Sequence, residues 1–308
     1  MTGLDLAVRY FQAHGVPLIE TRFAAHRDRI AAGLVGPGSE CFGFDDELSR
    51  DHDWGPGFCL WLAADDHRAI GARLQAALAD LPQTFEGIGP RQASAWGGGR
   101  VGVLEIGEFY RGLIGLDRAP RSLDDWRRIP EACLATATNG AVFTDPLGEF
   151  TRMRDQLLAF YPEDVRLKKI ASRCMTIAQS GQYNLPRCGQ RREFVAARCA
   201  EAQFCAHVVS LVFLLNRRYA PFYKWMHRAV KALPVLGAAT HHLLSELVTS
   251  YGFAKKSRIV EEIAVSLAGE LRRLGLSDAR SDFLVDHGPR VQERIRDPQL
   301  RRSDVWVE

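Results

Sequence analysis

The sequence has few cysteines, and none of them stands in a metal-binding or disulfide pattern. Its 308 residues include seven cysteines, an odd number, scattered between Cys41 and Cys205 without any C-x-x-C pair. Zinc sites and disulfide-bonded scaffolds both require closer spacing, so neither is expected. The cysteines are predicted to be reduced and to pack as small apolar residues, as in a cytoplasmic protein.

Long apolar runs and an excess of charge of one sign are also missing. The most apolar stretch, Phe204 to Leu215, has twelve residues, whereas a membrane-spanning helix needs roughly 20. We therefore expect a buried helix and no membrane span. The first residues lack the basic and apolar segments of a signal peptide, which favours a cytoplasmic location. With 40 basic and 37 acidic residues the net charge is +3, so no extended nucleic-acid surface is expected.

The pattern of the chain changes near Asp145. Before it, helical spacing over residues 5–15, 19–36 and 65–82 alternates with strand-like segments over 57–64, 84–89 and 93–110. After Asp145-Pro146 almost every segment has helical spacing: residues 147–161, 163–181, 192–216, 221–233, 239–248 and 259–275. The sequence predicts an α+β fold, with a mixed-sheet domain over residues 1–145 and an all-α helical-bundle domain over residues 146–308. The charged segment 287–308 is expected to be a solvated extension.

Acidic residues concentrate in a glycine-rich segment between Gly36 and Gly57. The segment begins with "GPGS", in which Gly38 lets the backbone approach a phosphate closely and Ser39 offers a hydroxyl. The adjacent Asp45 and Asp46 would point in opposite directions on a strand. They are more typical of a turn or a helix cap.

Three further carboxylates are candidates for a metal site. If a strand runs from His52 to Leu62, Asp51 and Asp53 project from one face of it because side chains alternate. Two such carboxylates repel each other, and a divalent cation such as Mg²⁺ relieves that repulsion. Glu105 stands inside the apolar strand-like segment "VGVLEIG", where an unpaired charge is unfavourable to bury.

These motifs together resemble a known superfamily. An apolar Val35, a Gly-Ser turn, the eleven residues 40–50 and then Asp-x-Asp are similar to the signature of DNA polymerase β-like nucleotidyltransferases. The blocks "GSECFGFDDELSRDHDWGP" and "LLNRRYAPFYKWMHRAVKALP" resemble DUF4037, a bacterial family of that superfamily, over most of the chain. The resemblance implies that Asp51, Asp53 and Glu105 hold two Mg²⁺ (or Mn²⁺) ions.

The resemblance also implies an enzyme of the EC 2.7.7 type. It would transfer an NMP, with AMP as the default and ATP as the donor, to a hydroxyl-bearing acceptor by a two-metal mechanism. Gly38 and Ser39 would hold the β- and γ-phosphates, while Arg50 either neutralises the triphosphate or is a surface arginine. The acceptor is expected to be a small molecule, with a protein or tRNA as second choice. The alternative is a nucleotide-binding regulatory or toxin–antitoxin-type protein, which a complete set of carboxylates disfavours.

The helical half supplies candidates for contacts with nucleotide and acceptor. Residues 180–198 form a polar stretch interrupted by glycine and proline, and residues 215–228 interleave aromatic with basic side chains. Such side chains contact bases and phosphates, although aromatic residues at helical spacing are also typical of a core. The candidates are Tyr183 for stacking on a base, Lys224 for a phosphate, and Glu193 or Glu201 as general base.

Overall fold

The contacts of the chain divide it into two compact units. The structure is a computed structural model that describes residues 1–92 and 100–308. Unit 1 comprises Met1–Pro120 and Cys133–Ala159, and unit 2 comprises Arg121–Ala132 and Phe160–Glu308. The chain therefore passes between the units three times. The two domains expected on either side of residue 145 remain a prediction, and the segment that follows this residue packs within unit 1.

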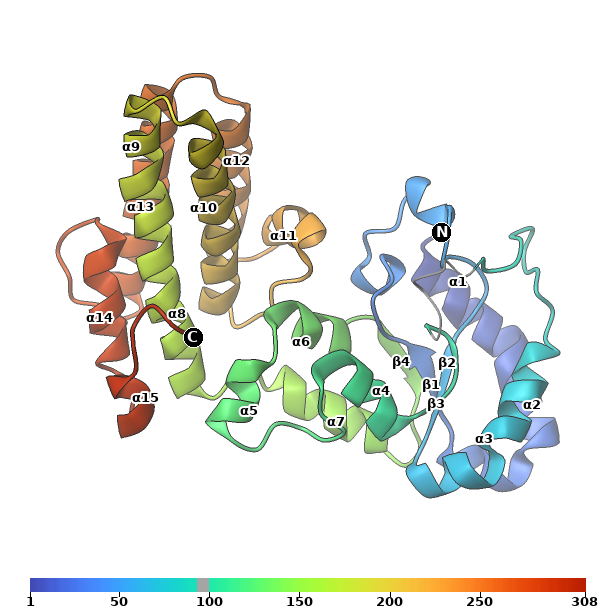
Figure 1. The fold of residues 1–308 in the computed structure, drawn as a ribbon. Coiled ribbons are helices and arrows are strands. Elements are labelled where there is room, and N and C mark those ends of the chain that lie inside the picture. Colours follow the sequence, from blue (N-terminus) through green and yellow to red (C-terminus); the bar gives the residue numbers. More distant parts are fainter. Residues whose placement is uncertain (93–99) are drawn as a thin grey trace. The chain divides into compact units, whose positions relative to one another are not determined.

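Unit 1 is built on a four-stranded mixed sheet (Figure 1), as an α+β fold requires. The strand order is β3-β2-β1-β4, in which β1 is antiparallel to both β2 and β4, and β2 is parallel to β3. The strands are β1 (Ala31–Leu34), β2 (Cys59–Leu62), β3 (Gly102–Glu105) and β4 (Ala141–Thr144).

The central strand β2 is buried on both faces of this sheet. Leu60 and Leu62 belong to a cluster of buried residues contributed by the three N-terminal helices and the sheet. Trp61 points to the opposite face because side chains alternate along a strand. Its ring stacks on Phe150 with 3.9 Å between centroids and meets Phe109 edge-on. The helices of unit 1 are α1 (Gly3–Tyr10), α2 (Val16–Arg22), α3 (Ala64–Ala79), α4 (Ile106–Ile114), α7 (Glu149–Leu158) and all but the first two residues of α6 (Glu131–Ala137), with a π-helical turn at Phe11–Gly15 and 3₁₀ turns at Ala24–Arg29, Glu40–Phe42 and Leu48–Arg50.

The helix predicted over residues 19–36 is wrong in its second half. Helix α2 ends at Arg22, and the chain continues through a 3₁₀ turn into β1. The small residues of β1 explain the difference. A Cβ atom added at Gly33 would lie 2.4 Å from the Ala141 carbonyl oxygen and 2.8 Å from the Trp61 ring. The close approach of β4 and Trp61 therefore selects a strand here, against the helical spacing.

Three segments predicted as strands form less strand than expected. The strand predicted from His52 begins only at Cys59, because Asp53 and Gly55 have φ angles of 52° and 135° that no strand accommodates. Residues 84–89 form a single bridge between Phe85 and Ile88. Of the segment predicted over 93–110, residues 93–99 lie outside the described residues, 102–105 form β3, and 106 begins α4.

Unit 2 is helical in the residues that the structure describes, and the six helices predicted after Asp145 are confirmed there and in α7. Residues 180–190, however, were predicted to be a polar link and are helical, as a π-helical segment (Ala178–Asn184) followed by α9. The helices of unit 2 are α5 (Leu123–Arg128), α8 (Glu163–Ile177), α9 (Leu185–Gln190), α10 (Phe194–Leu215), α11 (Tyr223–Val230), α12 (Gly237–Thr249), α13 (Phe253–Arg273), α14 (His287–Gln292) and α15 (Pro298–Arg302), with a 3₁₀ turn at Leu284–Asp286.

Helix α10 is the apolar helix of the sequence. Within the described ranges it is the one helix whose length and composition would allow it to cross a bilayer. Its most apolar 18-residue window has a mean hydropathy of 1.4, and 61% of that window is buried inside the protein. Leu211 and Leu214, for example, are fully buried. The prediction of a buried helix is confirmed.

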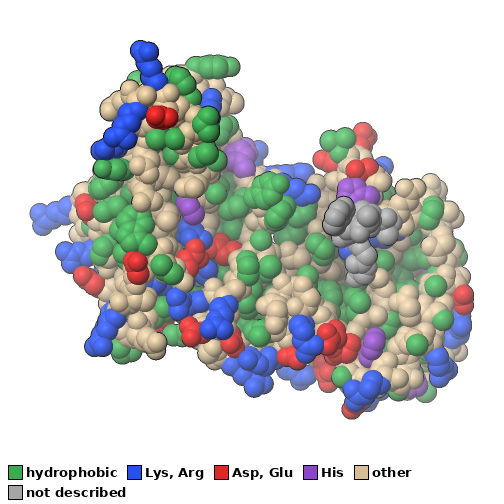
Figure 2. Space-filling model, in the orientation of Figure 1, with side chains coloured by type: hydrophobic (Ala, Val, Ile, Leu, Met, Phe, Trp, Pro, Cys, Tyr) green, Lys and Arg blue, Asp and Glu red, His purple; other side chains and the backbone are tan. Residues whose placement is uncertain are grey.

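Charges of both signs share the visible surface. On the face in Figure 2, Lys and Arg side chains lie among Asp and Glu side chains. The expected absence of an extended nucleic-acid surface stays a prediction. All seven cysteines are free, and Cys41, Cys59 and Cys174 are buried, as expected for cysteines that pack as apolar residues.

The C-terminal residues are packed against α8, so the predicted solvated extension is wrong. The Glu308 carboxylate forms ion pairs with Lys169, at 2.7 Å, and with Arg173. The Ser172 hydroxyl donates to the Trp306 carbonyl oxygen. The Glu308 carboxylate is thus attracted to the buried basic side chains of α8. The sequence of the C-terminal segment alone does not reveal that these partners lie beside it.

The Glu308 contacts predict a pH-dependent stability. Burial would raise the pKa of this carboxyl, but Arg173 and Lys169 outweigh burial and lower it from 4.5 to about 2. Because the folded-state pKa is depressed, the stabilisation is present above pH ~5 and is lost as the pH falls towards 2. We expect Glu308→Gln to lower the free energy of unfolding by about 2 to 3 kcal/mol at pH 7, measured by urea denaturation.

The difference between this variant and the wild type should shrink steadily between pH 5 and pH 2.5. Glu293→Gln is the matched control, because Glu293 forms an exposed pair with Arg290 and should change stability by less than about 0.5 kcal/mol. A destabilisation by Glu308→Gln that is equal at pH 7 and pH 2.5 would contradict the ion-pair explanation.

Candidate functional site

The Gly-Ser turn that follows β1 is fixed by an asparagine from a distant part of the chain. The Gly36 N–H donates to Asn139 Oδ1 at 3.0 Å, and Asn139 Nδ2 donates back to the Gly36 carbonyl oxygen at 2.7 Å. Next to it, the Gly140 N–H donates to the Cys41 carbonyl oxygen at 2.7 Å. Residues on both sides of the turn are therefore held to the start of β4.

Gly38 and Ser39 lie at the end of this turn. Gly38 is buried, and a Cβ atom there would lie 2.4 Å from a Glu40 carboxylate oxygen. Glycine is therefore required for the close packing of this carboxylate. Ser39 is half-buried and begins the 3₁₀ turn Glu40–Phe42. Its hydroxyl makes no hydrogen bond within the part of the chain that the structure describes, so it can donate to a ligand.

Glu40 forms a buried ion pair that sequence reasoning missed. Its Oε1 lies 2.6 Å from Arg91 Nη2, and the two side chains are 3% and 10% exposed. Arg91 also donates to the Gly55 carbonyl oxygen at 3.4 Å. The position of Glu40 directly after "GPGS" is a local signal, but no pattern links it to an arginine 51 positions later.

Asp45 and Asp46 have structural roles, as predicted. Asp45 Oδ2 accepts from the Gly3 N–H, at the start of α1, and from the Trp54 indole at 3.0 Å. Asp46 Oδ1 accepts from the Ser49 N–H and hydroxyl, both at 3.1 Å. These contacts use one oxygen of each carboxylate, and Asp45 Oδ1 is buried without a hydrogen-bond partner among the described residues.

The structure places Asp51 and Asp53 in different environments. Asp51 is exposed and pairs with the neighbouring His52 ring at 2.7 Å. Asp53 is 3% exposed, and its Oδ2 lies 3.4 Å from Arg100 Nη2. Its N–H donates to the Gln92 carbonyl oxygen at 2.6 Å. The expectation that both project from one face of a strand is wrong, because no strand forms here.

Glu105 stands at the opposite end of β3 from Asp53. Gly102, the first residue of β3, lines the same cavity as Asp53. Glu105 is three residues, about 10 Å, further along the strand. Its two carboxylate oxygens accept from the N–H groups of Gly107 and Glu108, at 2.8 and 2.6 Å. It therefore caps α4 and is not an isolated charge inside the strand.

The arrangement of these carboxylates does not fit one shared metal centre. A shared Mg²⁺ site needs several oxygen ligands within about 2.1 Å of one ion. Asp53 is paired with Arg100, Asp51 is exposed, and both oxygens of Glu105 cap a helix. Across residues 1–92 and 100–308, no three His, Cys, Asp or Glu side chains form a group that could hold a metal ion.

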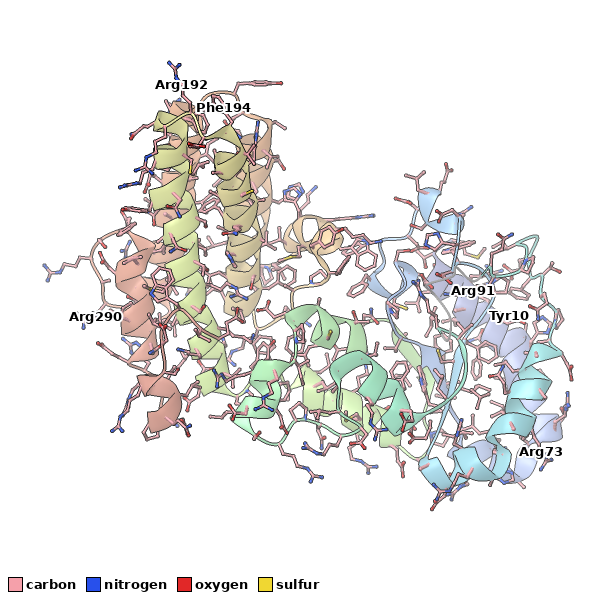
Figure 3. All side chains as sticks on the ribbon, in the orientation of Figure 1. Tyr10, Arg73, Arg91, Arg192, Phe194 and Arg290 are labelled. Atoms are coloured by element: carbon pink, nitrogen blue, oxygen red, sulfur yellow. The ribbon has the colours of Figure 1, made fainter. Side chains whose placement is uncertain are left out.

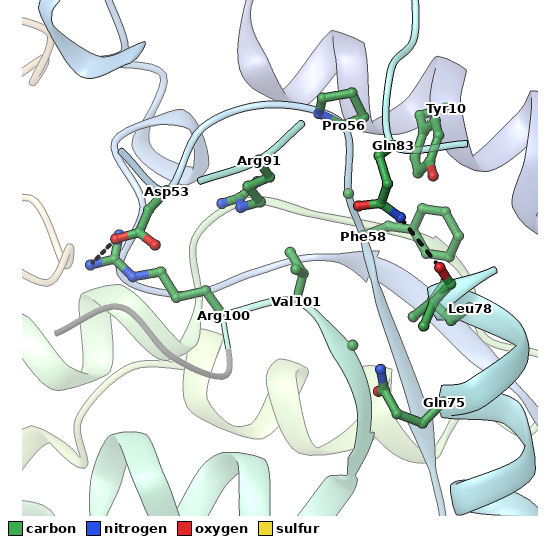
Figure 4. Close-up of a pocket in the computed structure, with 13 residues that line it drawn as sticks. Tyr10, Asp53, Pro56, Phe58, Gln75, Leu78, Gln83, Arg91, Arg100 and Val101 are labelled. Carbon is green, nitrogen blue, oxygen red and sulfur yellow. Dashed lines mark hydrogen bonds and ion pairs between the residues drawn. The ribbon is translucent and has the colours of Figure 1, made fainter. Parts of the chain in front are cut away.

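A cavity of about 290 Å³ beside β2 and β3 brings together the charged residues of this region. Asp53, Arg91 and Arg100 lie around one side of it, and Tyr10 and Gln83 lie on the other (Figure 4). Arg91 is paired with Glu40 and Arg100 with Asp53, so these four groups together carry no net charge. The guanidinium N–H groups not used in these pairs are donors that could hydrogen-bond a ligand. Arg91 and Arg100 were not selected from the sequence, where they appear only as single basic residues in a glycine-rich segment.

Arg50 belongs to unit 1, and the four candidates of the helical half belong to unit 2. The Arg50 guanidinium lies 4.7 Å from the centre of the Trp54 ring, on the exposed side of unit 1. In unit 2, each candidate already has a defined neighbour or position. Tyr183 packs against Arg187, Lys224 lies over the Trp225 ring, Glu193 is exposed at the start of α10, and Glu201 pairs with Lys256. Their roles in binding nucleotide or acceptor stay predictions.

Residues 126–226 match the family model described as "Domain of unknown function (DUF4037)". The match confirms the resemblance to this family over a segment that includes "LLNRRYAPFYKWM" and excludes the Gly-Ser and Asp-x-Asp motifs. A comparison with curated proteins found no match. Among solved structures, the chain is similar to the crystal structure of a nucleotidyltransferase-like protein from Exiguobacterium sibiricum 255-15. The TM-score is 0.37 at 11% identity, over 93% of this chain and 78% of that chain.

The buried Glu40–Arg91 ion pair predicts that a single substitution at the Gly-Ser turn strongly lowers the stability of the protein. Glu40→Gln leaves Arg91 as an uncompensated buried charge, so we expect a loss of about 3 kcal/mol in the free energy of unfolding. Asp65→Asn is the control, because Asp65 pairs with Arg68 on the exposed surface of the same unit and should cost less than about 1 kcal/mol. Urea denaturation measures both, and equal losses would show that Glu40 is not an effective partner of Arg91.

Proposed function

We propose that this chain, a DUF4037 relative over residues 126–226, is a nucleotidyltransferase. It would transfer an NMP, with AMP as the first choice, from an NTP to a hydroxyl-bearing acceptor. A small molecule is the preferred acceptor, and a protein or tRNA is the second choice. The proposal rests on one observation: the Gly-Ser turn after β1 is followed by an aspartate that is buried beside two arginines in a cavity.

Each residue of this region has a proposed task. The backbone at Gly38 and the free hydroxyl of Ser39 bind oxygens of the β- and γ-phosphates. Arg91 and Arg100 donate to phosphate oxygens through the guanidinium N–H groups that their pairs with Glu40 and Asp53 do not use. Arg50, which precedes Asp51, lies on the exposed side and can approach the triphosphate from solvent.

The transfer is a single displacement at phosphorus. The acceptor oxygen forms a bond to the α-phosphorus, and the bond from that phosphorus to the bridging oxygen of the β-phosphate breaks. Pyrophosphate leaves, and the hydroxyl proton passes to a base. Of the two candidates from the sequence, Glu193 and Glu201, we prefer the exposed Glu193, because Lys256 and Arg198 engage the Glu201 carboxylate. Positioning and charge stabilisation supply most of the rate in such reactions.

The resemblance also implies Mg²⁺ or Mn²⁺, through Asp51, Asp53 and Glu105. Because these carboxylates do not fit a shared ion as they are placed, no step of the reaction is assigned to a metal here. The assay below is therefore carried out with and without each ion.

One observation favours the alternative of a nucleotide-binding regulatory or toxin–antitoxin-type protein. Both oxygens of Glu105 are engaged in capping α4. A protein of this kind would bind the NTP in the same cavity and release it unchanged. Both functions therefore require NTP binding in the cavity, and only the enzyme converts the NTP into products.

The proposal predicts turnover that depends on Asp53. Purified chain is incubated with α-labelled ATP, Mg²⁺ or Mn²⁺ and a panel of hydroxyl-bearing acceptors, and pyrophosphate release is measured. We expect Asp53→Asn to reduce the rate by ~100-fold, the scale for losing one donor to transition-state charge, because Asp53 positions the Arg100 guanidinium. Asp51→Asn tests the role that the resemblance implies for the second aspartate. Asp46→Asn is the matched control, because Asp46 serves a local turn of the same segment.

The outcome separates the two functions. Label transfer or pyrophosphate release that survives in the control and is lost in Asp53→Asn supports the enzyme. Binding of ATP without release of pyrophosphate across the panel supports the regulatory protein. Turnover that is unchanged in folded Asp53→Asn would remove Asp53 from the site.

A further inference from the structure

We propose that unit 2 contains a binding site for a small aromatic anion, either an aryl carboxylate or an aryl phosphate. The site is a cavity of about 260 Å³ at the N-terminal ends of α10 and α13. It is formed by unit 2 alone and does not depend on nucleotidyl transfer. Figure 3 labels Phe194, the first residue of α10, at this end of the helical bundle.

Two helix N-termini meet at this cavity without side-chain caps. Helix α10 begins after Glu193 and α13 after Gly252, and neither of these residues accepts or donates a capping hydrogen bond through a side chain. The first N–H groups of a helix have no acceptor within the helix and carry partial positive charge. Both helices exceed 20 residues, so both termini attract an anion.

A buried lysine adds a full positive charge. Lys256 is 4% exposed, and its Nζ lies 2.6 Å from Glu201 Oε2. Arg198 donates to both oxygens of the same carboxylate, at 3.3 and 3.2 Å. Two cations thus share one anion, which leaves a net charge of +1 at the cavity wall.

An unpartnered hydroxyl is independent evidence for a missing polar partner. Ser250 lines the cavity and is 7% exposed. Its Oγ is buried and has no hydrogen-bond partner among the residues that the structure describes. A buried hydroxyl without a hydrogen-bond partner is unfavourable. An anionic oxygen bound between Ser250 and Lys256 would accept this hydrogen bond.

The remaining walls are aromatic. The rings of Phe194 and Phe253 are inclined by 19° with 6.2 Å between their centroids. Phe253 is fixed from behind, because a Cβ atom at Gly189 would lie 2.4 Å from its ring. Phe194 and Tyr251 are 61% and 94% exposed. A flat apolar ligand would cover these rings while its anionic group reaches the helix termini.

The size of the cavity limits the ligand. Sites for drug-sized ligands are roughly 300–1,000 Å³, so this cavity accepts a molecule with one aromatic ring and one anionic group. The carboxylate and the phosphate are not distinguished by this chemistry. Both are therefore tested.

The test is a saturation-transfer NMR titration of the full-length chain with four probes. We expect benzoate and phenyl phosphate to bind, and benzamide and inorganic phosphate to bind at least tenfold more weakly. Benzamide has the ring without the charge, and inorganic phosphate has the charge without the ring. Equal binding of benzoate and benzamide, or of phenyl phosphate and inorganic phosphate, would overturn the proposal. Whichever aryl anion binds more tightly identifies the class.

Variants locate the binding. Lys256→Met should weaken binding of the preferred aryl anion at least tenfold. Lys255→Met should change it less than twofold, because Lys255 pairs with Glu246 on the exposed surface. Since Lys256→Met leaves Glu201 with one cation fewer and can impair folding, Phe194→Ala is the second variant. The Phe194 ring is largely exposed, so the variant should fold normally and bind at least threefold more weakly.

A variant that is expected to strengthen binding of the aryl anion completes the test. Glu201→Gln removes the only negative charge of the cluster Arg198, Glu201 and Lys256, so it should strengthen binding of the aryl anion at least threefold. A purely structural role of these residues would not strengthen binding. Equal effects of the two lysine variants, or unchanged binding by folded Phe194→Ala, would place the ligand elsewhere and overturn the proposal.

Discussion

The burial of β2 on both faces is the constraint on which the rest of unit 1 depends. Leu60 and Leu62 complete the core beneath the N-terminal helices, and Trp61 completes the core beneath α4 and α7. The Trp61 ring also occupies the space above Gly33, so position 33 of β1 must be glycine. Since β1 leads into the Gly-Ser turn, the packing of Trp61 against Gly33 helps to place the strand from which that turn departs.

Basic side chains and hydrogen-bond donors hold most of the acidic side chains between residues 40 and 53 in place. Nearly every acid between residues 40 and 53 has a nearby partner: Arg91 for Glu40, two N–H groups for Asp45, Ser49 for Asp46, His52 for Asp51 and Arg100 for Asp53. Buried charges are tolerated when they are paired in this way. The concentration of acids therefore serves packing and capping as well as any ligand, and Asp53 is the acid that both is buried and lines the cavity.

The sequence predicted the helical half well because helical spacing is a local signal. The limits of α7, α10 and α12 are close to those expected, and the apolar stretch of α10 is buried, whereas α13 begins six residues before the predicted position 259. The errors arose where distant residues decide the structure. Helical spacing in residues 31–34 gave way to pairing with β4. The segment 287–308 was predicted to be solvated from its own charge alone, because its sequence gives no sign of the basic residues of α8 that it contacts.

The site could be predicted only in part for the same reason. The Gly-Ser turn follows from residues adjacent in sequence, whereas the placement of Asp51 and Asp53 on one face of a strand was wrong. Glu105 was selected as a charge within a strand, and the sequence does not reveal that the strand ends there and that the carboxylate caps the next helix. Arg91 and Arg100 are brought to the cavity by chain topology, which no spacing of residues encodes.

The three passages of the chain between the units have a consequence for the gene. Residues 121–132 belong to unit 2 although 27 residues of unit 1 follow them. They supply Trp126, which packs against Tyr161, and Glu131, which pairs with Arg173. A reading frame cut at residue 160 would thus encode a helical fragment without its own first segment. The two units can be duplicated, fused or exchanged in evolution only together, as one inherited module.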